Sequence, residues 1–184
     1  MKQIRHSIFE TNSSSTHSVS LTNISSDVPN FEQLDYYVDP ADHYIHIKFG
    51  EFGWGYDEYT DAYTKLQYLL TLLLEIKKAT FGREGITSMD EFYNLDEYIF
   101  IESIVTEHVK GCKGICIYDD GLEVKKYEGE NGETRYWTTH NGYVDHQSCE
   151  GYTSIYDFLE DWGTDIETFV FNENNMLVID SDNN

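Results

Sequence analysis

Residues 59–80 read YTDAYTKLQYLLTLLLEIKKAT, and this stretch decides the fold because it contains the most apolar run of the chain. Acidic residues lie near its start and two lysines near its end, an order that complements the helix dipole. Gly82 follows, and glycine commonly ends a helix. We therefore expect a long helix. Its leucines recur at i, i+3, i+4 and i+7, the spacing of one buried face: Leu66, Leu69, Leu70 and Leu73.

Two further helical regions are expected. Residues 89–110 carry an apolar stripe, and Ser88 and Glu91 have the spacing of a capping box before it. Residues 94–96 mark a point at which this region can divide into two helices. Residues 154–162 predict a short third helix, which Gly163 closes.

Strands are expected near both ends of the chain, with the long helices between them. Asp119-Asp120-Gly121 and Glu130-Asn131-Gly132 predict hairpin turns, and residues 172–175 predict a turn between the last two strands. The fold class we expect is α+β, a mostly antiparallel sheet with two long helices and one short helix on one face, in a single domain of residues 1–184. The expected strands are residues 18–24, 44–49, 114–119, 122–127, 134–139, 168–171 and 176–180.

The charge of the chain is strongly negative and unevenly distributed. Asp and Glu number 34 against 12 Lys and Arg, a formal net charge of -22. Residues 6–47, 84–109 and 136–184 contain six, seven and ten acids and no Lys or Arg. Such stretches oppose direct binding to nucleic acid or to anionic membranes, because phosphate binding requires Lys and Arg. They favour basic partners, although acidic residues also simply confer solubility.

Composition favours a folded protein of the cytosol. Disordered acidic chains have few aromatic residues, whereas 15% of this chain is aromatic. Three cysteines do not suggest a secreted disulfide framework. No apolar run follows Met1, so no signal peptide is expected, and the apolar residues 68–76 are too few to span a bilayer.

Two polar segments are candidates for chemistry. Residues 5–18 gather hydroxyls, one acid and two histidines before a strand, and such a loop can offer hydroxyl and backbone N–H groups to a phosphate. Residues 142–148 (GYVDHQS) form the second segment. A pocket joining the N-terminal run to the Asp145–Ser148 segment would use Glu10, His17 and His146 as acid–base or metal groups. The alternative function is therefore an enzyme or a nucleotide- or phosphate-binding protein. The simpler reading of the first segment is a polar N-terminus with turn-capping residues.

No metal site and no cofactor are expected. Cys112 and Cys116 have C-x3-C spacing, which differs from the C-x2-C of common zinc knuckles and suits core cysteines. His43 and His46 would lie on opposite faces of a strand, so they are a poor chelating pair.

Residues 9–18 (FETNSSSTHS) resemble the opening of a group of uncharacterised proteins from Gram-positive bacteria and their phages. Residues 142–148 and 169–172 are similar to the second half of those proteins. The resemblance implies a phage or mobile-element setting, within a bacterial host cell, and it carries no catalytic residue over. Small acidic proteins in such settings often block host defences, as anti-CRISPR and anti-restriction proteins do, and this analogy rests on charge and setting.

From these observations we expect a phage-type acidic inhibitor. Its partner would be a basic nucleic-acid-binding protein, such as a CRISPR effector nuclease, whose channel holds phosphate through Lys and Arg. Catalytic residues are not expected under this reading. The partner-binding residues we expect are acids of two helical regions: Asp90, Glu91, Asp96, Glu97, Asp157, Glu160, Asp161, Asp165 and Glu167.

Overall fold

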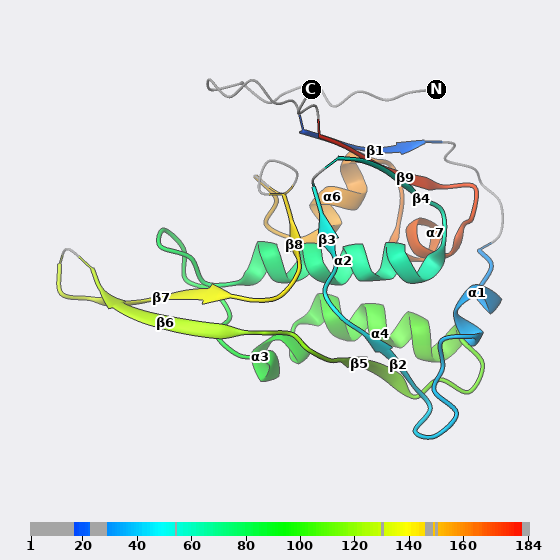
Figure 1. The fold of residues 1–184 in the computed structure, drawn as a ribbon, viewed down its shortest axis with the longest axis horizontal. Coiled ribbons are helices and arrows are strands. Elements are labelled where there is room, and N and C mark those ends of the chain that lie inside the picture. Colours follow the sequence, from blue (N-terminus) through cyan, green and yellow to red (C-terminus); the bar gives the residue numbers. More distant parts are fainter. Residues whose placement is uncertain are drawn as a thin grey trace.

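Helix α2 (Ala62–Lys77) runs through the middle of the molecule, and the other elements surround it (Figure 1). The computed structural model describes residues 17–22, 29–53, 55–129, 131–145, 149 and 151–181. Elements that pack on α2 include α1 (Glu32–Asp35), α4 (Asp96–His108), α6 (Ile155–Asp161), α7 (Ile166–Phe171) and β8 (Tyr143–Val144).

The expected central helix is confirmed, and it is buried on more than one face. Its N-terminus is capped by Asp61, whose carboxylate accepts a hydrogen bond of 2.8 Å from the Thr64 N–H. Leu66, Leu69 and Leu73 are fully buried, and so is Leu72 between them. A helix with neighbours on most sides needs apolar residues on most sides, which explains the leucine run.

The other two expected regions are helical. The expected two long helices and one short helix are wrong in number and length, because the second region is divided and α1 and α7 are additional helices. The second region consists of α3 (Met89–Tyr93) and α4, and residues 94 and 95 separate them. Ser88 caps α3 by accepting the Glu91 N–H. Ser154 and Asp157 form a capping box at the start of α6.

The fold class α+β is confirmed. The predicted single, mostly antiparallel sheet is wrong, because the strands of the described residues are divided among four small sheets. Strands β1 (His17–Thr22), β9 (Met176–Ser181) and β4 (Tyr56–Tyr59) pair antiparallel in that order. Two pairs are parallel: β2 (Tyr44–Ile47) with β5 (Gly114–Ile117), and β3 (Glu51–Phe52) with β8. The fourth sheet is the antiparallel pair of β6 (Glu123–Glu128) and β7 (Thr134–Thr139).

Two details of the predicted topology are wrong. Residues 168–171 form part of helix α7 and not a strand, because Asp165 caps a helix whose apolar residues Ile166, Phe169 and Val170 follow helical spacing. The turn at residues 119–121 does not join a hairpin. Strand β5, which precedes it, pairs in parallel with β2, and β6 pairs only with β7 in the described part of the chain.

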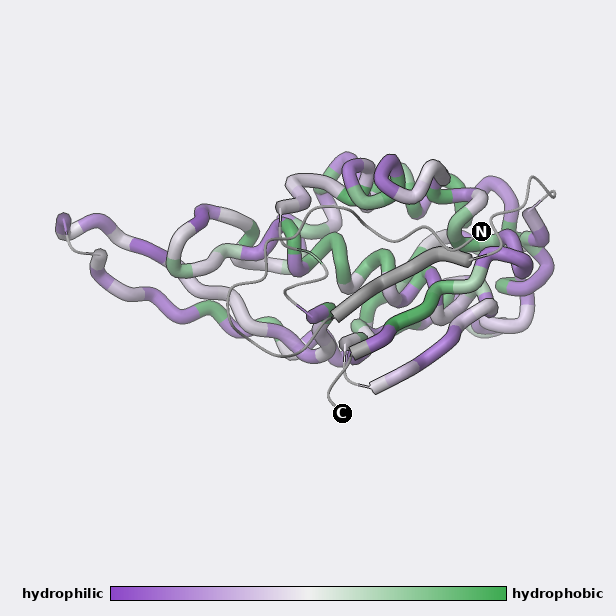
Figure 2. Tube along the Cα trace, turned by 90° about the horizontal axis from the view of Figure 1, so that it is seen from above, coloured by the Kyte–Doolittle hydropathy of each residue, from purple (hydrophilic) through white to green (hydrophobic). Residues whose placement is uncertain are grey.

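The hairpin of β6 and β7 projects from the body (Figure 1). Figure 2 shows hydrophilic residues along much of this hairpin and hydrophobic residues concentrated in the body. Phe81 packs against this hairpin, with its ring centroid 3.7 Å from that of Trp137 and 4.8 Å from that of Tyr127. A two-stranded ribbon is marginally stable alone, so this aromatic contact holds it in place.

Candidate functional site

The outward face of α4 carries exposed apolar side chains among acids. Ile99 and Phe100 are 50% and 47% exposed, although each is large and hydrophobic. They share this face with Asp96, Ser103 and Glu107, which are also exposed and which lie at helical spacing. The opposite face of α4 packs into the hydrophobic core, so the outward face stays exposed in the folded chain.

Helix α6 extends this surface. Tyr156 is 44% exposed, and its ring centroid lies 6.4 Å from that of Phe100. Partial burial, together with the nearby charges of Glu97 and Asp96, raises the pKa of the Tyr156 hydroxyl above its usual value. Glu160 is exposed one turn further along α6. We call the residues Asp96, Ile99, Phe100, Tyr156 and Glu160 the α4–α6 surface.

The nine acids predicted to bind a partner have different environments. Asp90, Asp96 and Glu160 are exposed acids of α3, α4 and α6. Asp161 is also exposed, and its carboxylate accepts the Tyr152 hydroxyl at 3.0 Å. Glu167 is half-buried in the first turn of α7.

Three predicted acids stabilise helix N-termini. Glu91 accepts the N–H and the hydroxyl of Thr87. Asp157 accepts hydrogen bonds from Thr153 and Ser154, and those from Thr153, together with the Ser154 N–H, hold the pKa of its carboxyl below the usual value. Asp165 accepts the Thr168 N–H at 2.7 Å. These carboxylates are oriented by the fold itself.

Glu97 is a correction to the predicted set. It is only 8% exposed, and its carboxylate lies 2.5 Å from the Lys77 Nζ. A buried carboxylate that is neutralised within the chain is not offered to a partner. The helical position of Glu97, one residue after the exposed Asp96, turns it toward α2 and away from solvent.

A second polar site lies at the C-terminal end of α2. The Glu75 carboxylate lies 2.7 Å from the Lys78 Nζ and 3.1 Å from the His140 Nε2, and the His140 side chain is 1% exposed. Burial opposes ionisation of Glu75, but these two partners outweigh it and hold its pKa below the usual value. The cluster joins α2 to the end of β7 and offers little access to solvent.

Cys149 lies close to this cluster but is not activated by it. Burial, and then the charges of Glu75 and Asp145, raise the pKa of its thiol to about 12. A thiol with this pKa is protonated at neutral pH, whereas nucleophilic cysteines have lowered pKa values. The arrangement therefore resembles a buried structural network more closely than a cysteine–histidine active site.

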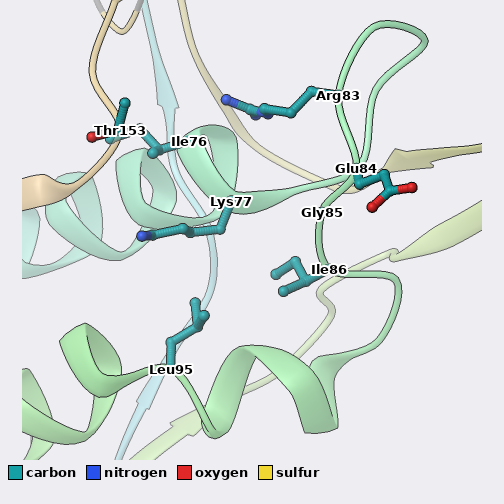
Figure 3. A pocket seen from close by; sticks show the side chains of 8 residues that line it. All are labelled: Ile76, Lys77, Arg83, Glu84, Gly85, Ile86, Leu95 and Thr153. Atoms are coloured by element: carbon teal, nitrogen blue, oxygen red, sulfur yellow. The ribbon is translucent and has the colours of Figure 1, made fainter.

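A surface pocket of about 340 Å³ lies beside the same helix end (Figure 3). Ile86 and Leu95 line it together with Lys77 and Arg83. Both bases already have partners, because Lys77 pairs with Glu97 and Arg83 donates to the backbone carbonyls of Glu75 and Lys78. Basic side chains at the C-terminus of a helix hydrogen-bond its unpaired carbonyls and interact favourably with the helix dipole. The presence of Lys77 and Arg83 at this position is therefore explained by the helix and does not require a bound ligand.

Of the three residues predicted to form the pocket of the alternative function, the described part of the chain contains only one. His17 is the first residue of β1 and pairs with Ser181, while Glu10 and His146 lie outside the described residues. Asp145 follows β8, and its N–H donates to the Phe52 carbonyl at 2.9 Å.

The two cysteines of the C-x3-C segment are free thiols. Cys112 lies before β5 and is buried, and Cys116 lies within β5 and is half-buried. Within the described ranges, the one group of His, Cys, Asp and Glu side chains with metal-ligand geometry does not contain them. It is formed by Asp39, Asp42 and His46. The histidine spacing in the sequence paired His46 with His43 alone and did not include the two aspartates.

No family model, curated protein or solved structure matches this chain. No helix in the described part of the chain has the length and hydrophobicity needed to cross a membrane.

Proposed function

We propose that this chain is a phage-type acidic inhibitor that binds a basic nucleic-acid-binding protein, such as a CRISPR effector nuclease, and occupies its nucleic-acid channel. The observation that carries the proposal is the α4–α6 surface, where two helices carry exposed apolar side chains together with exposed acids. The formal net charge of -22 gives this surface a negative background.

Electrostatics supports a basic partner. A nucleic-acid channel binds phosphate through Lys and Arg, so it also attracts carboxylates on a rigid body. The N-cap hydrogen bonds of α3 and α7 and the capping box of α6 stabilise the first turns of these helices. Long-range attraction of this kind accelerates association and weakens with added salt.

The apolar side chains of the α4–α6 surface would supply binding free energy that charge alone does not provide. Aromatic residues at the centre of an interface commonly provide most of the binding free energy, and polar residues at the rim add specificity. Phe100 and Tyr156 contact each other, and the exposed acids Asp96 and Glu160 lie one helical turn away from them on α4 and α6. The partner surface that fits has an apolar contact area flanked by Lys or Arg.

Capture from a bacterial lysate at low and high salt tests the proposal. Wild-type protein is compared with the double variant Asp96→Asn, Glu160→Gln and with the control Glu123→Gln, Glu128→Gln. The control removes the same two charges from exposed positions of β6. We expect salt to release the captured protein and the α4–α6 variant to capture less than the control. Capture that is insensitive to salt would rule out the electrostatic mechanism.

A further inference from the structure

We propose that Asp39, Asp42 and His46 form a binding site for a divalent transition-metal cation of the zinc type. Each residue offers one ligand atom, and these three atoms all lie within 4.8 Å of one another. None of the three belongs to the α4–α6 surface, so the proposal is independent of the proposed function.

The backbone brings the three residues together through a tight turn before β2. The Asp39 N–H donates to the Tyr44 carbonyl at 2.9 Å, and the His43 N–H donates to the Asp39 carbonyl at 2.8 Å. This turn folds Asp39 and Asp42 back onto the start of the strand. His46 then follows two residues after Tyr44, on the same face of β2.

Hydrogen bonds to the backbone orient both carboxylates. Asp39 Oδ1 accepts the Ala41 N–H at 2.7 Å, and Asp42 Oδ1 accepts the Tyr44 N–H at 2.9 Å. Asp42 Oδ2 faces the His46 Nε2 at 2.8 Å. Partners of this kind fix ligand geometry in metal sites. The second oxygen of Asp39 takes part in none of these hydrogen bonds, whereas a cation would have to replace the contact between Asp42 Oδ2 and the His46 Nε2.

The donor set indicates the class of metal. One imidazole nitrogen and two carboxylate oxygens suit Zn²⁺ and related transition metals, which accept mixed nitrogen and oxygen ligands. Ca²⁺ and Mg²⁺ prefer oxygen ligands alone and more of them. Three protein ligands leave a coordination position for water. The two carboxylates balance the charge of a divalent ion.

The contact between Asp42 and His46 also has an explanation without a metal, and the experiment must distinguish the two. Asp42 and His46 lie four residues apart and form an ion pair when the imidazole is protonated. Asp39 has no role in that ion pair, but it supplies the third ligand of a metal site. The effect of changing Asp39 therefore distinguishes the two explanations.

Isothermal titration of Zn²⁺ into the full-length, chelator-treated, untagged protein tests the site. We expect saturable binding that Asp39→Asn and His46→Gln each weaken about 10- to 100-fold. The control His43→Asn changes an exposed histidine of the same turn that is not in the cluster, and asparagine tolerates its positive φ of 72°. This control is expected to bind like the wild type, and circular dichroism checks that each variant is folded.

Three results would overturn the proposal. The first is no saturable Zn²⁺ binding by the wild type. The second is unchanged affinity in Asp39→Asn or in His46→Gln. An unaffected Asp39→Asn would exclude Asp39 as a ligand, and no effect of either variant would place any bound zinc elsewhere, for example on the cysteines. The third is equal affinity for Mg²⁺ or Ca²⁺, which would contradict the assigned class of metal.

Discussion

The buried Lys65 of α2 donates from its Nζ to the backbone carbonyl of Asn172 at 2.7 Å, directly after α7 ends. A second hydrogen bond of 3.1 Å reaches the Asn175 carbonyl. Lys65 has no exposed surface, and burial lowers its pKa to about 8. One lysine therefore links the central helix to α7 and to the turn before β9.

Lys65 makes stability depend on pH. The unfolded chain holds this proton up to its usual pKa near 10.5, whereas the folded chain releases it near pH 8. Between these values the unfolded state binds more protons, so the free energy of unfolding rises with pH, by an amount on the order of 3 kcal/mol in total. Urea unfolding of wild type and Lys65→Met from pH 7 to 10 measures it. We expect the difference between them to grow with pH in favour of the wild type. A difference that stays constant over this range would contradict the assignment.

The exposed apolar residues of the α4–α6 surface are expected to matter for binding and not for folding. Phe100→Ser is expected to change the free energy of unfolding by no more than about 0.5 kcal/mol, as for most surface substitutions. It is expected to weaken partner binding by about 2 kcal/mol, roughly 30-fold. The control is Tyr136→Ser on β7, which is 43% exposed and outside this surface. Equal loss of binding in both variants would argue against a specific surface.

Gly53 is required where the end of β3 meets Asp145. A Cβ atom at Gly53 would lie 2.5 Å from the Asp145 Cβ, and the residue has a φ of 139°. Gly53→Ala is expected to lower the free energy of unfolding by more than about 1 kcal/mol. Gly55→Ala is the matched control, because Gly55 also has a positive φ, of 96°, but a Cβ atom at this position would have no neighbouring atom within 4 Å. Urea unfolding should show a larger loss for Gly53→Ala, and equal losses would exclude the steric contact.

The capping box of α6 stabilises the helix that carries Tyr156 and Glu160. Ser154 Oγ accepts the Asp157 N–H at 3.2 Å, and Asp157 accepts the Ser154 N–H at 2.9 Å. Ser154→Ala is expected to cost about 1 kcal/mol of stability, while Ser154→Thr keeps the hydroxyl and most of that stability. Thermal unfolding of both variants measures this. A threonine variant as unstable as the alanine variant would show that the cap hydrogen bond is not the cause.

Local patterns predicted the helical regions of α2, α3, α4 and α6 because their signals are local, but they missed α1 and α7. The leucine spacing of α2 and the capping sequences of α3 and α6 each act within a few residues. Residues 168–171 were misassigned because a short apolar run fits both helical and strand periods, and the Asp165 cap decides between them. The pairing of β5 with β2 joins segments about 70 residues apart, and no local pattern encodes that pairing.

The candidate sites were predicted less completely, because they depend on how segments distant in sequence pack together. The exposed acids Asp96 and Glu160 follow from composition, but their proximity to Phe100 and Tyr156 depends on how α4 and α6 pack. The burial of Glu97 against Lys77 depends on the same packing. The Asp42–His46 contact has the i, i+4 spacing of a helix, yet it forms across a turn.

The most direct measurement is capture of host proteins from a bacterial lysate with and without excess duplex DNA, read by mass spectrometry. The bait is the wild-type chain, with the Asp96→Asn, Glu160→Gln variant and the β6 charge control in parallel. The proposed function predicts that a basic nucleic-acid-binding protein is captured by wild type and control, is displaced by DNA, and is largely lost with the α4–α6 variant. Capture of no such protein, or capture that DNA and the α4–α6 variant leave unchanged, would contradict it.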